Sequence, residues 1–68
     1  MTGDRRRGVV AEFDADQGLG MIVDAAGQRY RFHCIEIVDG SRDIDVGAEV
    51  GFDSMPKLGR YEAARIAP

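Results

Sequence analysis

The sequence predicts an all-β fold, a small closed barrel of five antiparallel strands. Apolar residues recur at every second position, and nine glycines divide the 68 residues into short segments. Short segments separated by turn residues are typical of an all-β domain. Five short strands enclose little volume as two packed sheets, whereas one closed barrel gives them a shared core and leaves no exposed edge.

Each expected strand is marked by β-branched, aromatic or small apolar residues that alternate with polar ones. In chain order, the five ranges are 8–14, 18–23, 28–34, 47–54 and 60–66. Glycines in the second range allow that strand to bend, and the third range alternates aromatic with basic side chains. Gly27 can take the positive φ of the turn between these two strands. The stretch 35–46 is the longest connection and holds one helical turn at most, while 55–59 is a shorter loop.

The side chains expected to face the barrel interior occupy alternate positions in the strands. They are Val10, Ile22, Tyr30, Phe32, Ile44, Val50, Phe52, Ala64 and Ile66.

Composition narrows the class of protein. Cys34 is the one cysteine, which excludes an internal disulfide and a cysteine-based metal centre and fits a reducing cytoplasm. No stretch approaches the roughly 20 apolar residues of a membrane span, and the N-terminal residues lack the apolar run of a secretory signal. We therefore expect a cytoplasmic protein that needs no metal, cofactor or membrane.

Charge is distributed unevenly along the chain. Nine Lys and Arg residues face twelve Asp and Glu residues, for a net charge of −3, yet Arg5, Arg6 and Arg7 are consecutive. We expect a flexible basic arm over residues 1–6 and the barrel over residues 7–68. The three arginines are candidate phosphate contacts, although the acidic balance argues against a mainly electrostatic grip on nucleic acid.

Five short motifs resemble, in order and spacing, those of a bacterial cold-shock domain, which is an OB-type barrel. They are GVVAEF at 8–13, QGLGMI at 17–22, YRFHC at 30–34, VGAEVGF at 46–52 and AARI at 63–66. The resemblance implies a five-stranded antiparallel OB-type barrel. It also implies a protein that binds single-stranded RNA or DNA and is not an enzyme.

Cold-shock domains stack bases on exposed aromatic side chains, and most of these aromatics are replaced in this sequence. The replaced positions hold Glu12, Leu19, Met21, Arg31 and Cys34, and Gln17 stands in place of the motif lysine. Phe13 and His33 are retained. Stacking contributes roughly 1–3 kcal/mol per base, whereas a micromolar complex has about 8 kcal/mol in total. The resemblance therefore implies weak to moderate binding through an altered surface.

Alternation places the candidate binding residues on one face. Leu19 and Met21 share one side of the second strand, and Arg31 and His33 share one side of the third. These strands are neighbours in an OB barrel, and this face is the one that such barrels use for oligonucleotides. The predicted nucleic-acid-binding residues are Phe13, Leu19, Met21, Arg31, His33 and Lys57, with Glu12 at the border.

Two functions stay open at this point. The first is a cold-shock-like module that binds single-stranded RNA or DNA with a reduced or re-tuned surface. The second is a protein-interaction module that has lost general nucleic-acid binding and docks through Leu19, Met21, Arg31 and Cys34. In either case we expect a monomer or weak dimer.

His33 and Cys34 give no sign of catalysis. No nucleophile or paired carboxylate accompanies His33, so no catalytic site is expected. Cys34 is expected to be a partly buried structural thiol, directed away from the neighbouring imidazole.

Overall fold

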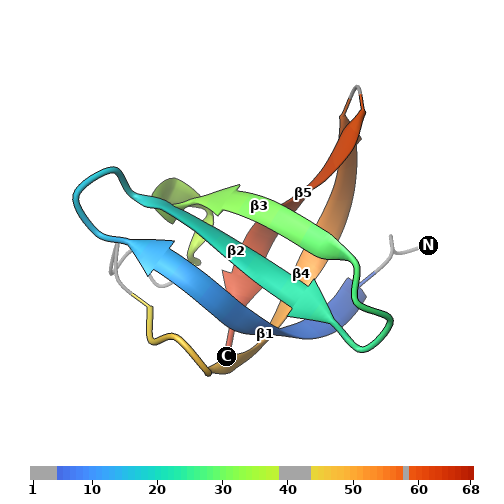
Figure 1. Cartoon of the computed structure of the whole chain (residues 1–68), viewed down its shortest axis with the longest axis horizontal. Coiled ribbons are helices and arrows are strands. Elements are labelled where there is room, and N and C mark those ends of the chain that lie inside the picture. The colour runs from blue at the N-terminus through green and yellow to red at the C-terminus, as the bar shows by residue number, and fades with distance from the viewer. Residues whose placement is uncertain (1–4, 39–43, 58) are drawn as a thin grey trace.

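Five strands close into a barrel (Figure 1). The computed structural model describes residues 5–38, 44–57 and 59–68, with the backbone alone for Lys57. In chain order, the elements are β1 (Arg5–Asp14), β2 (Leu19–Asp24), β3 (Arg29–His33), the 3₁₀ turn η1 (Cys34–Glu36), β4 (Glu49–Lys57) and β5 (Arg60–Ala67). Around the barrel the strand order is β1-β2-β3-β5-β4. The expected all-β barrel of five strands is confirmed.

One pair of neighbouring strands is parallel, which corrects the prediction of a wholly antiparallel barrel. Four pairs are antiparallel, namely β1 with β2, β1 with β4, β2 with β3 and β4 with β5. β3 and β5 run parallel, with Arg31 opposite Glu62. Strand directions can alternate all the way around a ring only when the number of strands is even. A closed ring of five strands must therefore contain at least one parallel pair.

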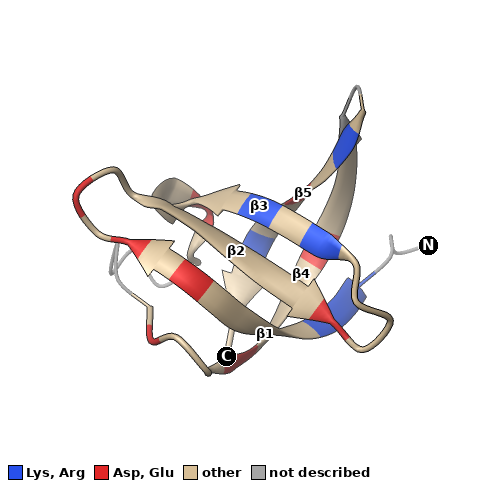
Figure 2. Ribbon diagram, in the orientation of Figure 1, with Lys and Arg blue, Asp and Glu red and all other residues tan. Residues whose placement is uncertain are grey.

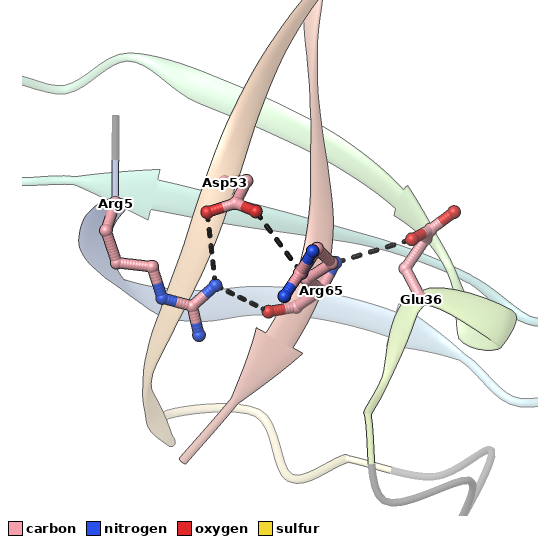
Figure 3. A network of polar contacts seen from close by, with 4 residues as sticks. All are labelled: Arg5, Glu36, Asp53 and Arg65. Carbon is pink, nitrogen blue, oxygen red and sulfur yellow. Dashed lines mark hydrogen bonds and ion pairs between the residues drawn. The ribbon is translucent and has the colours of Figure 1, made fainter. Parts of the chain in front are cut away.

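β1 begins earlier than expected, and this changes the role of Arg5. Arg5 was expected in a flexible arm, whereas the structure places it in β1, opposite Asp53 of β4. Its Nη1 donates to the carbonyl oxygen of Arg65 at 2.8 Å and lies 3.3 Å from Oδ1 of Asp53 (Figure 3). Nε of Arg65 lies 3.5 Å from Oδ2 of Asp53, and the N–H of Arg65 donates to Oε1 of Glu36 at 3.3 Å. Arg5 thus joins β1 to β4 and β5. The first four residues of the expected arm lie outside the described residues.

The hairpin of β4 and β5 is longer than expected. The range 55–59 was assigned to a loop, but pairing continues from Met55 opposite Glu62 to Lys57 opposite Arg60. The two strands therefore project beyond the rest of the barrel as a long hairpin (Figure 1).

The barrel interior holds the residues that alternation predicts. Of the nine expected core side chains, eight are buried and Ile44 is partly buried against them. Among the described residues, two further hydrophobic side chains are buried. Ile37 follows η1 and forms a bridge with Ile66. Ala63 is buried beside another buried alanine, since strict alternation fails at the β-bulge of β5, where Arg65 has a φ of 53°.

Candidate functional site

A groove with a volume of about 600 Å³ lies over β2 and β3 and is lined by residues of all five strands. The predicted binding residues that line it are Phe13, Leu19, Met21, Arg31 and His33. Lys57 lies at the end of β4, and its side chain falls outside the described part of the chain. The range 5–7 does not line the groove, because it pairs with β4 at the other end of β1. The structure thus gathers five of the candidates, whose role in binding stays a prediction.

Strand register arranges the groove side chains in two rows across the sheet. Glu12 of β1 lies opposite Met21 of β2, and Met21 lies opposite Arg31 of β3. Arg31 in turn lies opposite Glu62 of β5. The second row consists of Asp14, Leu19 and His33. In both rows, an apolar residue on β2 separates a carboxylate on β1 from a nitrogen-bearing side chain on β3. Figure 2 shows the acidic end of β1 on one side of β2 and the basic positions of β3 on the other.

A β-bulge brings Glu12 to this face. Val10 pairs with Ile22 and Glu12 pairs with Met21, so β1 advances two residues while β2 advances one. Regular alternation would point Glu12 to the same side as the buried Val10. The extra residue, Ala11, reverses the side, and both Ala11 and Glu12 are exposed.

The floor of the groove is formed by Gly20 and two phenylalanine rings. Phe32 is 3% exposed and lies against Gly20, where a Cβ would stand 2.4 Å from Cζ of the ring. The ring of Phe13 is parallel to that of Phe32, with 6.0 Å between centroids and 6° between planes. Phe13 is half-buried, so it offers less ring surface to a base than a fully exposed aromatic would.

His33 has one ring nitrogen committed to the backbone. The N–H of Ile35 donates to Nδ1 of His33 at 3.3 Å, which leaves the proton of the neutral imidazole on Nε2. The exposed His33 therefore presents an N–H donor.

Cys34 is partly buried against the core, as expected, but it is not directed away from His33. Its Sγ lies 3.8 Å from Nδ1 of His33. The strand ends at His33 and Cys34 begins η1, so strand alternation does not extend to this pair.

The groove contains more carboxylates than arginines. The carboxylates are those of Glu12, Asp14, Glu36 and Glu62, and the arginines are Arg31 and Arg60. Nε of Arg60 lies 3.3 Å from Oε2 of Glu62. Asp14 accepts two N–H groups of the turn that follows it, and Glu36 accepts the N–H of Arg65. Within residues 5–38, 44–57 and 59–68, the side chains of Glu12 and Arg31 make no hydrogen bond or ion pair.

Among the described residues, the two groups with shifted pKa values lie outside the groove. The hydroxyl of Tyr30 donates to Oδ2 of Asp24 at 2.8 Å. This hydrogen bond is the main reason that the pKa of Asp24 is lowered from its ordinary value. Burial is the main reason that the pKa of Tyr30 is raised, and the bond to Asp24 adds to it.

Two other kinds of site are not seen in the part of the chain that the structure describes. It contains no helix long and apolar enough to span a membrane. It also contains no group of three or more His, Cys, Asp or Glu side chains placed to hold a metal ion.

Sequence reasoning missed the far side of the groove. Met55, Arg60 and Glu62 come from the β4–β5 hairpin, and Glu36 comes from η1. The charged residues Arg60 and Glu62, two positions apart on an expected strand, were the available signal for this side, but they do not reveal which strand lies beside β5.

A closed five-stranded barrel with this strand order has the OB-type fold of a cold-shock domain. A solved structure described as Drosophila Unr CSD456 matches the chain with a TM-score of 0.80 and 33% sequence identity. The match covers 96% of this chain and 26% of that one, so this chain spans about a quarter of the solved chain. No protein-family model matches, and no curated protein matches.

The similarity supports the cold-shock resemblance and a fold associated with nucleic-acid binding. Membership of the bacterial branch and the equivalence of the replaced aromatic positions stay predictions.

Proposed function

We propose that this chain binds single-stranded nucleic acid, RNA or DNA, through the groove over β2 and β3 and catalyses no reaction. The observation that carries the proposal is the apolar strip of Leu19 and Met21, which lies in the groove between polar side chains that can contact base edges. Leu19 is 44% exposed and Met21 is half-buried, so the two side chains give the groove an apolar surface that solvent can reach.

The contacts are expected to fall mainly on bases. The chain has a net charge of −3, and four carboxylates line the groove, so phosphates are not strongly attracted to it. Leu19 and Met21 provide apolar surface for a base, and Arg31 can stack on a base or pair with a phosphate. Weak to moderate affinity follows, because aliphatic side chains replace the aromatic platforms that are worth roughly 1–3 kcal/mol per base.

Fluorescence anisotropy with mixed-sequence single-stranded RNA and DNA tests the proposal. Leu19→Asp should weaken binding at least tenfold, because it places a charge in the apolar strip. Val46→Asp is the matched control, since Val46 is 62% exposed and does not line the groove. An equal loss in both variants would mean that net charge matters and the groove does not. Absence of binding at low salt would contradict the proposal.

A second candidate function has one observation in its favour. The excess of carboxylates over arginines in the groove suits a protein partner with basic and apolar side chains. This is the protein-interaction module that the sequence left open. A basic, leucine-containing peptide that binds the chain, when single strands do not, would favour this function.

We also propose that the protein is cytoplasmic, in keeping with the single thiol, and that it is a monomer or weak dimer.

A further inference from the structure

Glu12 and Arg31 are oppositely charged and face the same groove without contacting each other. They belong to one row across the sheet, in which Met21 lies between them. Within the described part of the chain, neither side chain forms a hydrogen bond or an ion pair. Both are exposed, so their charged groups are available to a ligand.

The spacing of the strands leaves room for one base between these two charges. Adjacent strands lie 4.7–4.9 Å apart, so the backbones at Glu12 and Arg31 are separated by about 10 Å. Met21 is half-buried and provides an apolar surface between them. A base lying on Met21 would turn one edge toward the carboxylate and another toward the guanidinium.

The chemistry of the two side chains selects among the bases. An ionised carboxylate only accepts hydrogen bonds, and a guanidinium only donates them. Guanine has two donors on one edge, N1–H and the 2-amino group, and two acceptors on another, O6 and N7. Uracil and thymine flank their single donor with two carbonyl oxygens, which a carboxylate repels. Cytosine and adenine offer one amino group each and lack the paired donors of guanine.

We propose that the row Glu12–Met21–Arg31 is a guanine-selective subsite, a specificity that rests on the proposed binding of single strands. Glu12 accepts from the donor edge of guanine, Met21 packs against the face of the ring, and Arg31 donates to O6 and N7. The row of Asp14, Leu19 and His33 repeats the order less strongly. Asp14 is already engaged by its own turn, and His33 presents a single N–H.

The test uses short single strands that differ in one base. A five-nucleotide strand of uridine with one central position, occupied in turn by each base, avoids the self-association of guanine-rich strands. The guanine strand should bind about tenfold more tightly than the all-uridine strand, which corresponds to 1.4 kcal/mol. Inosine, which lacks the 2-amino group, and 7-deazaguanine, which lacks N7, should each lose part of this preference.

Variants assign each edge to its partner. Glu12→Gln should remove the sensitivity to inosine, while affinity for the all-uridine strand stays equal or rises because one negative charge is gone. Glu49→Gln is the matched control, an exposed carboxylate outside the groove. Arg31→Gln should remove the sensitivity to 7-deazaguanine. Arg29→Gln is its control, on the same strand but outside the groove.

The outcomes separate this inference from the proposed function. If the parent binds all five-nucleotide strands equally well, the guanine subsite is refuted and the binding function stands. If it binds neither these strands nor longer mixed-sequence ones, the proposed function itself fails. A guanine preference that survives Glu12→Gln and Arg31→Gln would also refute the subsite.

Discussion

Substituting Gly20 by alanine should destabilise the barrel through a clash with the groove floor. A Cβ at this position would stand 2.4 Å and 2.6 Å from ring atoms of Phe32 and 2.8 Å from the carbonyl oxygen of Glu12. Gly20 does not have a positive φ, so the cost is steric and not conformational. The ring of Phe32 cannot easily retreat, because it is buried and Phe13 is stacked parallel to it.

The size of the effect follows from the contacts. Overpacking a core costs about 1–3 kcal/mol, and three contacts below 3 Å place Gly20→Ala toward the upper end. Alanine also makes the unfolded chain less flexible, which offsets about 0.4–1 kcal/mol of this cost. The free energy of unfolding should therefore fall by about 2 kcal/mol in total. A 68-residue domain has a free energy of unfolding of about 3–10 kcal/mol. With a urea m-value of about 1 kcal/mol/M, the midpoint should fall by about 2 M.

Urea denaturation of matched variants measures this effect. Gly51→Ala is the control, since Gly51 is also a buried strand glycine without positive φ, but its Cβ would lie 3.5 Å or more from flexible arginine side chains. Gly51→Ala should be neutral or slightly stabilising. Combining Gly20→Ala with Phe32→Leu should cost at least 1 kcal/mol less than the sum of the two single changes, because the ring is gone. Equal midpoints for the two alanine variants, or strict additivity in the double variant, would refute the steric argument.

Three further predictions concern affinity, pH dependence and backbone strain. The double change Leu19→Phe and Met21→Phe should tighten binding of mixed-sequence single strands at least tenfold in anisotropy titrations, because each ring adds about 1–3 kcal/mol of stacking; unchanged affinity in a folded variant would argue against base stacking on this face. Tyr30→Phe should weaken the pH dependence of urea unfolding at both extremes. In the parent, the lowered pKa of Asp24 stabilises the folded state above pH 3.8, and this stability is lost as the pH falls through the folded pKa. The raised pKa of Tyr30 stabilises the folded state below pH 10.0, and this stability is lost as the pH rises through the folded pKa. Arg65→Gly should be more stable than Arg65→Ala by about 1 kcal/mol in thermal or urea unfolding, because only glycine adopts the φ of 53° without strain; the reverse order would contradict it.

The strands and core could be predicted from sequence because they depend on local alternation. Phe52 and Ile66 are buried where the period of two places them. The outer part of the β4–β5 hairpin was assigned to a loop because Pro56 and Gly59 are typical of loops, although strand pairing extends past Pro56. The burial of Ala63 next to Ala64 was missed because it depends on a β-bulge, and no residue type in the sequence indicates this bulge.

The candidate site was predictable on β2, on β3 and at Phe13 of β1, but alternation does not predict the direction of Glu12. Leu19 and Arg31 face the groove because their strands are regular and pair in register. The direction of Glu12 depends on Ala11 being an extra residue, and alternation from Val10 gives the opposite side. Bulges are set by the twist that closes the barrel, a property of the whole fold.

The parallel seam between β3 and β5 has a consequence for the order of folding. β1, β2 and β3 are joined by short turns and can pair soon after the chain collapses, whereas the seam joins Arg31 to Glu62, and the whole of β4 lies between these two residues in the sequence. Distant contacts form late, because the entropy of closing the intervening loop must be overcome first.

A late seam is also the place where the folded barrel should open most readily. β3 pairs with β5 at a single register position, Arg31 opposite Glu62, whereas β2 pairs along its whole length with β1. Beyond β3, the seam continues in the Ile37–Ile66 bridge and in the hydrogen bond from the N–H of Val38 to the carbonyl oxygen of Ile66. Amide protons of β5 near Glu62 should therefore exchange with solvent sooner than those of β2. The groove lies across this seam. A bound single strand would therefore hold β3 and β5 together, and amide exchange along β5 should slow as the groove becomes saturated.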